Sequence, residues 1–359
     1  MASISLSRTK EKCLVSLPSK NIEIYRVILS KEEREEYDRM ELDAKKLVEW
    51  YISDDSRMAI NYSSILSILM RLRQMCTDLA LCPADLRAVP PPCKIEDAKN
   101  NPRLLEKLLL VLEDGEDFDC PICLYPPTNI VITCCTHIFC WSCIWKTIKR
   151  GNNSCPMCRH RLSESDLFKA PSESSQATSS YTSSSKVTAL LQLLSASRDQ
   201  NPSVKSVIFS QFRKLLLLLE EPLKEAGFKF LRLDGSLNGI TRANVIKRFG
   251  VPAPEGPTIL LASLRASSAG INLTAASTVY LMEPSWNPGM EEQAMNRVNR
   301  IGQKEEVKIV RFIATNTIDE RLLQLQERKK MLPTKASGRT RSKDQKEITR
   351  EDLRALMNL

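Results

Sequence analysis

The sequence contains little glycine, and none of it lies in a phosphate-binding motif. Only 11 of the 359 residues are glycine, and no glycine is followed by lysine. A phosphate loop has the pattern G-x4-G-K-[ST], in which backbone N–H groups and the lysine hold the phosphates of a nucleotide. No Asp-Glu-x-His string is present to hold magnesium. We therefore expect that this chain alone hydrolyses no ATP.

Long apolar runs are absent as well. No stretch reaches the roughly 18 apolar residues that a membrane-spanning helix needs, and the apolar run at 215–219 ends at Glu220. The first residues, MASISLSRTKEK, contain no apolar segment of the kind that a signal peptide requires. We therefore expect neither a secreted protein nor a membrane protein.

The basic residues are concentrated in the second half of the chain. The formal net charge is +9, from 52 Lys and Arg against 43 Asp and Glu. Residues 1–185 hold 24 basic and 25 acidic side chains, whereas residues 186–359 hold 28 and 18, a surplus of +10. A surplus confined to one half favours a polyanionic partner such as nucleic acid. The alternative is a solvated basic face.

Composition divides the chain into six segments. Eight of the 12 cysteines lie between Cys120 and Cys158, and the other four are scattered as in a protein of a reducing compartment. The segments are a helical N-terminal region (1–86), a linker with a short helix at 103–113 (87–114), a cysteine-rich region (115–165), a Ser-rich linker (166–185), an α/β region (186–333) and a basic tail with a terminal helix (334–359).

Strand and helix patterns alternate along the α/β region. Strands separated by helices pair in parallel through right-handed crossovers, which predicts a parallel sheet with helices on both faces. The predicted strands are 204–210, 228–233, 258–263, 278–282 and 307–314, and the predicted helices are 212–226, 240–249, 289–301 and 318–331.

The cysteine-rich region has the spacing of a zinc module. Zinc takes four nitrogen or sulfur ligands in a tetrahedron, and a Cys-x2-Cys pair places two thiolates on one tight turn. Eight ligands are enough for two Zn²⁺ ions. The order is Cys120-x2-Cys123-x11-Cys135-x1-His137-x2-Cys140-x2-Cys143-x11-Cys155-x2-Cys158.

With a single histidine in fourth place, this order closely resembles a RING finger, whereas a plant homeodomain finger has its histidine one place later. The resemblance implies a cross-brace in which Cys120, Cys123, Cys140 and Cys143 hold one ion and Cys135, His137, Cys155 and Cys158 hold the other. Cys134 also lies near the third position, but the family usually leaves one residue before the histidine, which favours Cys135.

RING fingers typically bind a ubiquitin-conjugating enzyme through apolar residues beside the first and last Cys-x2-Cys pairs. Here these residues are Ile122 and Pro156. Arg159 follows the last ligand, where active RING ligases often carry a cation that bridges the conjugating enzyme and ubiquitin, a task that suits the planar donors of arginine. The alternative is a purely structural zinc module without a partner.

Five strings in the α/β region resemble the second motor lobe of Swi/Snf-type helicase-like ATPases. They are VIFSQF (207–212), LDGS (233–236), SLRASSAGINLTAAS (263–277), EPSWNP (283–288) and EEQAMNRVNRIGQ (291–303). The segment SRTK (7–10) also resembles a string of this family, and SILMRLRQMCTDLALCP (67–83) resembles the helix that follows its first motor lobe. The resemblance therefore implies that residues 1–86 are the helical end of the first motor lobe. A RING finger between two motor lobes is characteristic of the helicase-like transcription factors and the post-replication repair translocases, and the chain resembles plant-like members of this subfamily.

The resemblance implies a RecA-like lobe and roles for particular residues. Gln293, Arg297 and Arg300 lie at i, i+4 and i+7, on one face of a helix, from which two arginines would reach the γ-phosphate of a nucleotide across a cleft. Contacts with the DNA backbone are implied for six residues: Ser210, Gln211, Ser263, Arg265, Asn272 and Thr274. The sequence departs from the family at Asn296 and Asn299, where an acidic residue and a histidine are usual, and at Ser285, where tryptophan is usual.

Taken together, the motifs predict the C-terminal part of a nuclear DNA translocase that carries a ubiquitin ligase module. The first motor lobe is expected to be missing, so that ATP and Mg²⁺ would enter only with a complete two-lobe form. The expected partners are double-stranded DNA or chromatin, a ubiquitin-conjugating enzyme and ubiquitin. The rival hypothesis is a non-enzymatic adaptor that binds DNA or the ubiquitin machinery without turnover.

Overall fold

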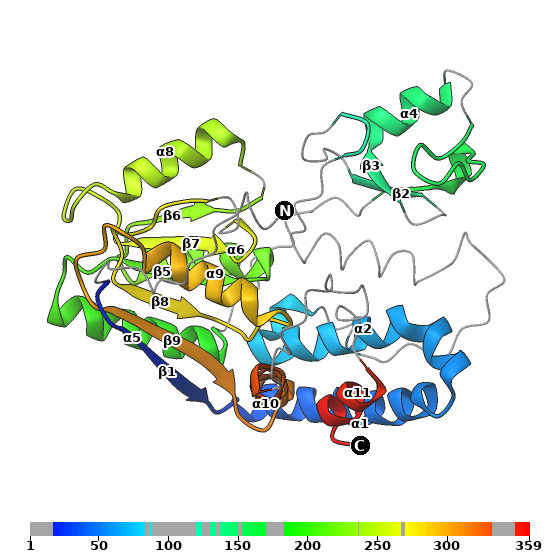
Figure 1. The fold of residues 1–359 in the computed structure, drawn as a ribbon, viewed down its shortest axis with the longest axis horizontal. Helices are drawn as coiled ribbons and strands as arrows, with labels where there is room; N and C mark the ends of the chain where they lie inside the picture. Colours follow the sequence, from blue (N-terminus) through cyan, green and yellow to red (C-terminus); the bar gives the residue numbers. More distant parts are fainter. Residues whose placement is uncertain are drawn as a thin grey trace, which may run out of the picture.

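The protein is described here from a computed structural model (Figure 1). The structure describes residues 17–82, 87, 120–123, 130–133, 137–149, 153–169, 183–235, 237–266, 270–331 and 349–359. The helix predicted at 103–113 lies outside these residues.

The largest element is a parallel sheet of six strands in the order β1-β9-β8-β5-β7-β6, which runs from bottom to top in Figure 1. Its strands are β1 (Lys20–Val27), β5 (Ser206–Ser210), β6 (Phe230–Leu233), β7 (Ile259–Ser263), β8 (Thr278–Leu281) and β9 (Val307–Ala314). The predicted parallel sheet with its alternating helices is confirmed, and the predicted bounds of β9 agree with the structure.

Successive side chains of each strand pack on opposite faces of the sheet, because the side-chain period of a strand is two. In β5, Ile208 contacts the helices on one face, which are α5 (Ser185–Gln200), α6 (Arg213–Leu218) and α7 (Glu220–Glu225). Its neighbours Val207 and Phe209 pack on the other face with α8 (Gly239–Phe249) and α9 (Pro288–Val298). Both faces of the central strands are therefore buried, as expected of a parallel sheet.

The helix predicted over 212–226 is divided into α6 and α7. The break falls at Leu219, and Pro222 lies inside α7. Proline has no N–H to donate and crowds the carbonyl of the preceding turn, so a continuous α-helix through this position is disfavoured.

The N-terminal region joins the same body. Strand β1 pairs with β9 along its whole length, from Lys20 opposite Val307 to Val27 opposite Ala314. The helices α1 (Lys31–Ile52) and α2 (Asp55–Thr77) then pack with α10 (Ile318–Met331) and α11 (Arg350–Met357) around one apolar core. Ser30 and Glu33 form a capping box that fixes the start of α1. In the part of the chain that is described, no helix is both long enough and apolar enough to cross a membrane.

The cysteine-rich region forms a small separate unit at the upper right of Figure 1. It contains a three-stranded antiparallel sheet in the order β3-β2-β4 and one helix, with bounds β2 (Ile130–Thr133), β3 (Ile138–Cys140), α4 (Trp141–Lys149) and β4 (Leu167–Lys169). Its core includes Phe139, Ile144 and Leu162 beside buried cysteines. So small a core is expected to need a metal to remain folded.

Candidate metal centres and motor site

The first candidate metal centre brings together Cys120, Cys123, Cys140 and Cys143. Their four sulfur atoms all lie within 4.8 Å of one another, and the Sγ atoms of Cys123 and Cys140 are 3.8 Å apart. A tetrahedral zinc ion with Zn–S bonds of about 2.3 Å requires sulfur atoms about 3.8 Å apart. The residues therefore fit zinc, in the grouping that the sequence predicted.

The local structure prepares these cysteines for a cation. Cys120 and Cys123 flank a turn, Cys140 ends β3, and Cys143 lies in the first turns of α4. The backbone N–H of Cys140 donates to Cys120 Sγ at 3.4 Å. Burial raises the pKa of Cys120, but backbone N–H donors outweigh it and lower the pKa to about 7. Desolvation and the neighbouring thiols raise the pKa of Cys143 to about 12. Four thiolates this close together would therefore need a dication to balance their charge.

The second candidate centre contains His137, Cys155 and Cys158. His137 Nδ1 lies 3.6 Å from Cys155 Sγ, which matches the separation of about 3.6 Å expected for a nitrogen and a sulfur ligand on one tetrahedral zinc ion. The predicted fourth ligand, Cys135, and its rival Cys134 lie outside the described residues. Three of the four predicted ligands are therefore brought together.

The residues predicted to bind a conjugating enzyme lie at the surface of the finger. The Ile122 side chain is 37% exposed, and Pro156 and Arg159 are exposed as well. Met157, which the sequence analysis did not select, is 56% exposed beside Pro156. Apolar side chains that remain exposed beside zinc ligands offer a surface for a partner. The position of Met157 could have been predicted from the sequence, because it lies between Cys155 and Cys158.

Trp141 and Trp145 stack on each other one turn apart on α4. Their ring centroids are 5.0 Å apart and their planes meet at 19°. The Lys149 ammonium lies 5.0 Å from the centre of the Trp145 ring. Both tryptophans are half-buried, so each contributes to packing and to the surface of the finger.

Several predicted motor residues lie where the parallel strands end. Ser210 ends β5 and Ser263 ends β7, and strands that run in parallel bring these ends to the same edge of the sheet. Ser263 is 6% exposed and its Oγ accepts from the Ala266 N–H at 3.2 Å. Ser210 is fully buried, and its hydroxyl lies 3.0 and 3.1 Å from the two carboxylate oxygens of Glu283.

Glu283 is a residue of this site that the sequence analysis did not select. It begins the EPSWNP string, is 1% exposed, and also accepts a hydrogen bond from the Gln211 N–H. Burial raises the pKa of its carboxyl group to about 7, although Gln211, Lys186, Arg73 and Ser210 act in the opposite direction. Glu283 therefore fixes the backbone that carries Ser210 and Gln211.

The helix α9 ends at Val298, so Arg300 does not share a helix face with Gln293 and Arg297 as predicted, and it instead joins the segment after α9 to the loop before β8. Arg300 donates from Nη1 to the carbonyls of Gly270 and Ile271, at 3.1 and 3.2 Å. This contact places Arg300 beside Asn272, which is exposed, and Thr274, whose N–H donates to Asn272 Oδ1 at 3.2 Å. Gln293 is exposed, and Arg297 and Arg265 are half-buried. The structure thus brings the predicted nucleotide residue Arg300 to the backbone directly before Asn272, one of the predicted DNA contacts.

Gln303, the last residue of the EEQAMNRVNRIGQ string, connects the end of α9 with the loop before β8. Its Nε2 donates to the carbonyls of Ala276 and Val298, at 2.8 and 3.2 Å, and its Oε1 accepts from the N–H groups of Lys304 and Glu305. All polar atoms of a buried amide are thereby satisfied.

The departures from the family pattern have structural partners. Asn299 is 5% exposed and donates from Nδ2 to the carbonyl of Pro18 at 3.1 Å, which ties the end of α9 to the segment before β1. Asn296 is half-buried. Ser285 donates its N–H to Glu291, and Gln326 donates to the Ser285 carbonyl and to Glu291.

Charged residues inside the body surround the EPSWNP string. Arg73 is fully buried, donates to the carbonyl of Pro284, and lies 5.0 Å from the centre of the Trp286 ring.

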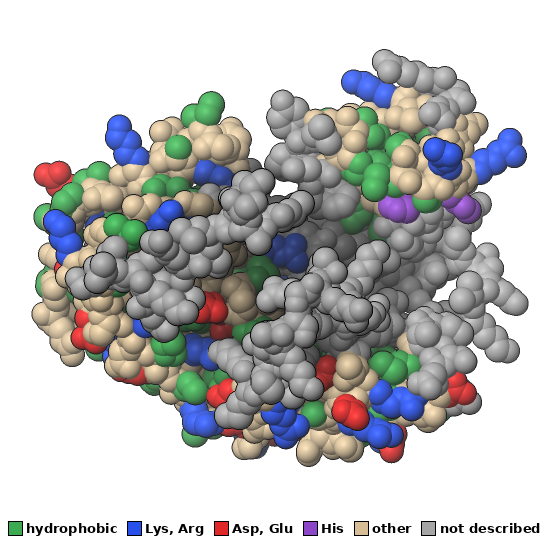
Figure 2. Space-filling model, viewed as in Figure 1, with side chains coloured by type: hydrophobic (Ala, Val, Ile, Leu, Met, Phe, Trp, Pro, Cys, Tyr) green, Lys and Arg blue, Asp and Glu red, His purple; other side chains and the backbone are tan. Residues whose placement is uncertain are grey.

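On the exposed surface the charges are mixed. Figure 2 shows Lys and Arg side chains among acidic ones over the left and lower parts of one face, whereas the described part of the unit at the upper right shows Lys, Arg and His side chains without acidic ones.

Two family models match this chain. The model described as "Ring finger domain" matches residues 118–159, and the model described as "Helicase conserved C-terminal domain" matches residues 185–302. The first covers both candidate metal centres, and the second covers β5 to α9.

Relatives with similar sequences extend over nearly the whole chain. The SWI/SNF-related matrix-associated actin-dependent regulator of chromatin subfamily A member 3-like 1 of Arabidopsis thaliana is 55% identical, over 100% of this chain and 41% of that protein. The helicase-like transcription factor of Mus musculus is 36% identical, over 98% of this chain and 36% of that protein. DNA repair protein RAD5B of A. thaliana is 35% identical, over 92% of this chain and 27% of that protein. The chain spans less than half the length of each of these relatives.

A solved structure has a similar fold. The crystal structure of the C-terminal part of the Fun30 ATPase domain matches with a TM-score of 0.51 and 22% identity, over 86% of this chain and 90% of that chain. This likeness concerns the fold of the chain and not its function. The two domains and the sequence similarities together match the chain to the RING-containing subfamily of Swi/Snf-type helicase-like proteins, which confirms the resemblance drawn from the motifs.

Proposed function

We propose that this chain is the C-terminal portion of a nuclear, ATP-dependent translocase on double-stranded DNA, and that its RING finger is a ubiquitin ligase module. The observation that carries the proposal is the occurrence in one chain of two zinc-type ligand groups and a helicase C-terminal lobe. Relatives named for chromatin regulation and DNA repair support a role in chromatin regulation or DNA damage tolerance.

The ligase module would act by positioning rather than by covalent chemistry. Two zinc ions would hold the finger in shape. Ile122 and Pro156, with Met157, would contact the ubiquitin-conjugating enzyme, and Arg159 would orient the ubiquitin that is bound to it as a thioester. Holding the reacting groups in one geometry removes much of the entropic barrier to transfer.

The motor lobe would contribute DNA contacts and the γ-phosphate arginines. Ser263, Arg265, Asn272 and Thr274 lie on either side of the Gly270 and Ile271 carbonyls that Arg300 contacts, and through these contacts Arg300 would link DNA binding to the nucleotide state. The sequence has no phosphate loop, and ATP and Mg²⁺ would bind only together with a first motor lobe.

A ubiquitin-discharge assay tests the ligase assignment. Conjugating enzymes charged with ubiquitin are mixed with the 359-residue chain and free lysine, and loss of the thioester is followed in a single turnover. We expect faster discharge with at least one enzyme of a panel, and no acceleration by the Cys155→Ala variant. The rival adaptor function predicts binding of the charged enzyme without acceleration of discharge.

A further inference from the structure

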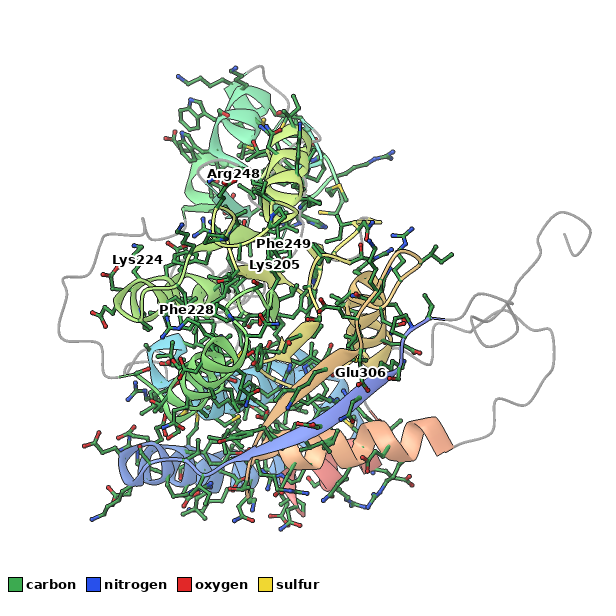
Figure 3. All side chains as sticks on the ribbon, turned by 90° about the vertical axis from the view of Figure 1, so that its left-hand side faces the viewer. Lys205, Lys224, Phe228, Arg248, Phe249 and Glu306 are labelled. Carbon is green, nitrogen blue, oxygen red and sulfur yellow. The ribbon has the colours of Figure 1, made fainter. Side chains whose placement is uncertain are left out.

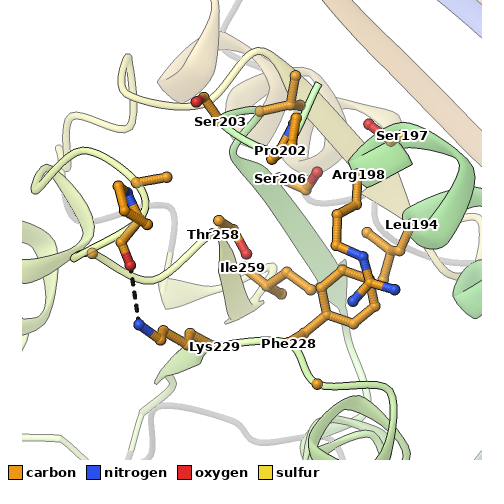
Figure 4. A pocket seen from close by; sticks show the side chains of 15 residues that line it. Leu194, Ser197, Arg198, Pro202, Ser203, Ser206, Phe228, Lys229, Thr258 and Ile259 are labelled. Atoms are coloured by element: carbon orange, nitrogen blue, oxygen red, sulfur yellow. Dashed lines mark hydrogen bonds between the residues drawn. The ribbon is translucent and has the colours of Figure 1, made fainter. Parts of the chain in front are cut away.

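A pocket opens at the edge of the sheet opposite the predicted motor residues (Figure 4). Ser206 lies at the start of β5 and Ile259 at the start of β7, while Phe228 and Lys229 directly precede β6. The cavity has a volume of about 340 Å³, which is within the range of about 300–1,000 Å³ that is typical of ligand sites.

The pocket and the predicted motor residues lie at opposite ends of the same parallel strands. Ser210 and Ser263 lie at the carboxyl ends of β5 and β7, whereas the pocket lies at their amino ends. The four steps from the first to the last residue of each strand, at about 3.3 Å each, place these ends about 13 Å apart. A ligand in the pocket would therefore leave the predicted DNA and nucleotide residues accessible.

One side of the pocket is apolar and carries an aromatic ring under a cation. The Phe228 ring is 8% exposed, and the Arg198 guanidinium lies 4.4 Å from its centroid. Leu194 and Ile259 extend the apolar side. Phenylalanine and arginine are both enriched at protein–protein interfaces relative to the rest of the surface.

The pocket also presents two cations that keep free donors, Arg198 and Lys229. Arg198 donates from Nη1 to the Ala226 carbonyl at 2.8 Å, and Lys229 donates from Nζ to the Pro254 carbonyl at 3.0 Å, the dashed line in Figure 4. Within the described residues neither side chain is in a salt bridge with a carboxylate. Guanidinium and ammonium groups have five and three N–H donors, so both have donors left for an anionic group.

We propose that this pocket binds a short acidic peptide segment of a partner protein. A large apolar side chain of the segment would pack on Phe228, Leu194 and Ile259, and flanking carboxylates would pair with Arg198 and Lys229. The surplus of +10 in residues 186–359 favours an acidic partner over a basic one. Nucleic acid fits less well, because most of the lining is apolar and, among the described residues, only Arg198 and Lys229 are lining cations, whereas nucleic-acid binding rests on many phosphate contacts.

Fluorescence anisotropy with a defined probe tests the proposal. The probe is a fluorescein-labelled ten-residue peptide of alternating Asp or Glu and Leu or Phe, titrated with the full 359-residue chain. Its matched control replaces every Leu and Phe by Ser and keeps the charge. We expect saturable binding of the first peptide, and at least tenfold weaker binding of the second.

Charge reversals then locate the site. Arg198→Glu and Lys229→Glu should each weaken peptide binding at least tenfold. Lys224→Glu and Arg248→Glu, which reverse exposed cations outside the pocket (Figure 3), should change it less than twofold. Circular dichroism confirms that each variant is folded. All four residues are exposed, so loss of the fold is not expected.

Three results would overturn the proposal. One is equal binding of the Ser-substituted peptide, which would indicate unspecific charge attraction. Another is an equal loss of affinity in the pocket variants and the control variants. The third is competition of double-stranded DNA for the probe together with weakened DNA binding by Arg198→Glu, which would assign the pocket to nucleic acid.

Discussion

Lys186 Nζ lies 2.6 Å from Asp319 Oδ2, and neither side chain is exposed to solvent. The same ammonium donates to the Met282 carbonyl at 3.0 Å. Burial by itself would lower the pKa of Lys186, but the Asp319 carboxylate holds this pKa above its ordinary value. One ion pair thus joins the start of α5, the end of β8 and the start of α10.

Removal of the carboxylate should be strongly destabilising. Asp319→Ala leaves the Lys186 ammonium buried without its counter-ion, and we expect a loss of about 3–5 kcal/mol in the free energy of unfolding. Urea denaturation monitored by circular dichroism measures it. The control is Glu221→Ala, which breaks the exposed pair with Lys224 and should cost less than about 1 kcal/mol. Similar losses in the two variants would contradict this role for the buried pair.

The buried carboxyl group of Glu283 should make stability depend on pH. Its pKa in the folded chain is about 7 against an ordinary 4.5, so the folded state holds an extra proton between these values and stability falls as pH rises through the window. Glu283→Gln keeps an acceptor for Ser210 and does not ionise. Relative to wild type, we expect the variant to gain about 1–3 kcal/mol from pH 5 to pH 8.

Urea titrations at pH 5, 6, 7 and 8 measure that gain. Glu305→Gln serves as the control, because Glu305 is exposed and its replacement should leave the pH profile unchanged. A difference between Glu283→Gln and wild type that stays constant over the four pH values would show that Glu283 does not titrate in this window.

The helices and central strands were predictable, whereas the edge of the sheet was not. The strand 307–314 and the helix 318–331 have buried apolar residues at regular spacing, and their predicted bounds agree with the structure. Strand β1 was missed because most of its side chains are exposed. Its partner β9 lies more than 280 residues further along the chain, and no local pattern reveals such a pairing.

The candidate site was predictable in its motifs and not in its supporting contacts. The spacing of the cysteines and His137 identified a zinc module with enough ligands for two ions, and the resemblance to a RING finger implied how these ligands divide into two groups. Arg73 and Glu283 were not recognised as neighbours of the motor site. A charged residue within an apolar helix, as Arg73 is, was the available signal, since a charge on a buried face requires a partner.

Metal analysis should find two zinc ions per chain. Chelation should unfold residues 115–165 and leave the α/β body cooperative, because the two units have separate cores. Cys155→Ala should release one ion, and Cys134→Ala should release none if Cys135 is the fourth ligand. Inductively coupled plasma mass spectrometry gives the count. One ion or fewer in the wild-type chain would exclude the cross-brace.

Substitutions of Ile122 and Arg159 should affect different steps, binding of the conjugating enzyme and discharge of ubiquitin. Ile122→Ala should weaken binding of the conjugating enzyme by about 1–3 kcal/mol, through loss of apolar burial. Arg159→Ala should leave that affinity nearly unchanged and slow ubiquitin discharge, because its proposed task is to orient the thioester. The adjacent His160→Ala is the matched control, since His160 is exposed and outside the ligand groups. Wild-type discharge by Arg159→Ala would refute the bridging role.

The isolated chain should hydrolyse no ATP, even though Arg297 and Arg300 are proposed to contact the γ-phosphate in a complete motor. Arg297 and Arg300 can stabilise charge only on a phosphate that is already bound, and the sequence provides neither a phosphate loop nor a magnesium-binding acidic motif. Arg300 instead donates to the carbonyls of Gly270 and Ile271.

DNA-stimulated phosphate release by the chain, purified free of host ATPases, measures this. Weak DNA binding should persist and fall with salt, because backbone contacts need no nucleotide. Addition of a first motor lobe from a relative should restore slow turnover, and Arg300→Ala should abolish it. Turnover by the isolated chain that is lost in Arg300→Ala would show that this lobe binds nucleotide by itself, through groups other than a phosphate loop.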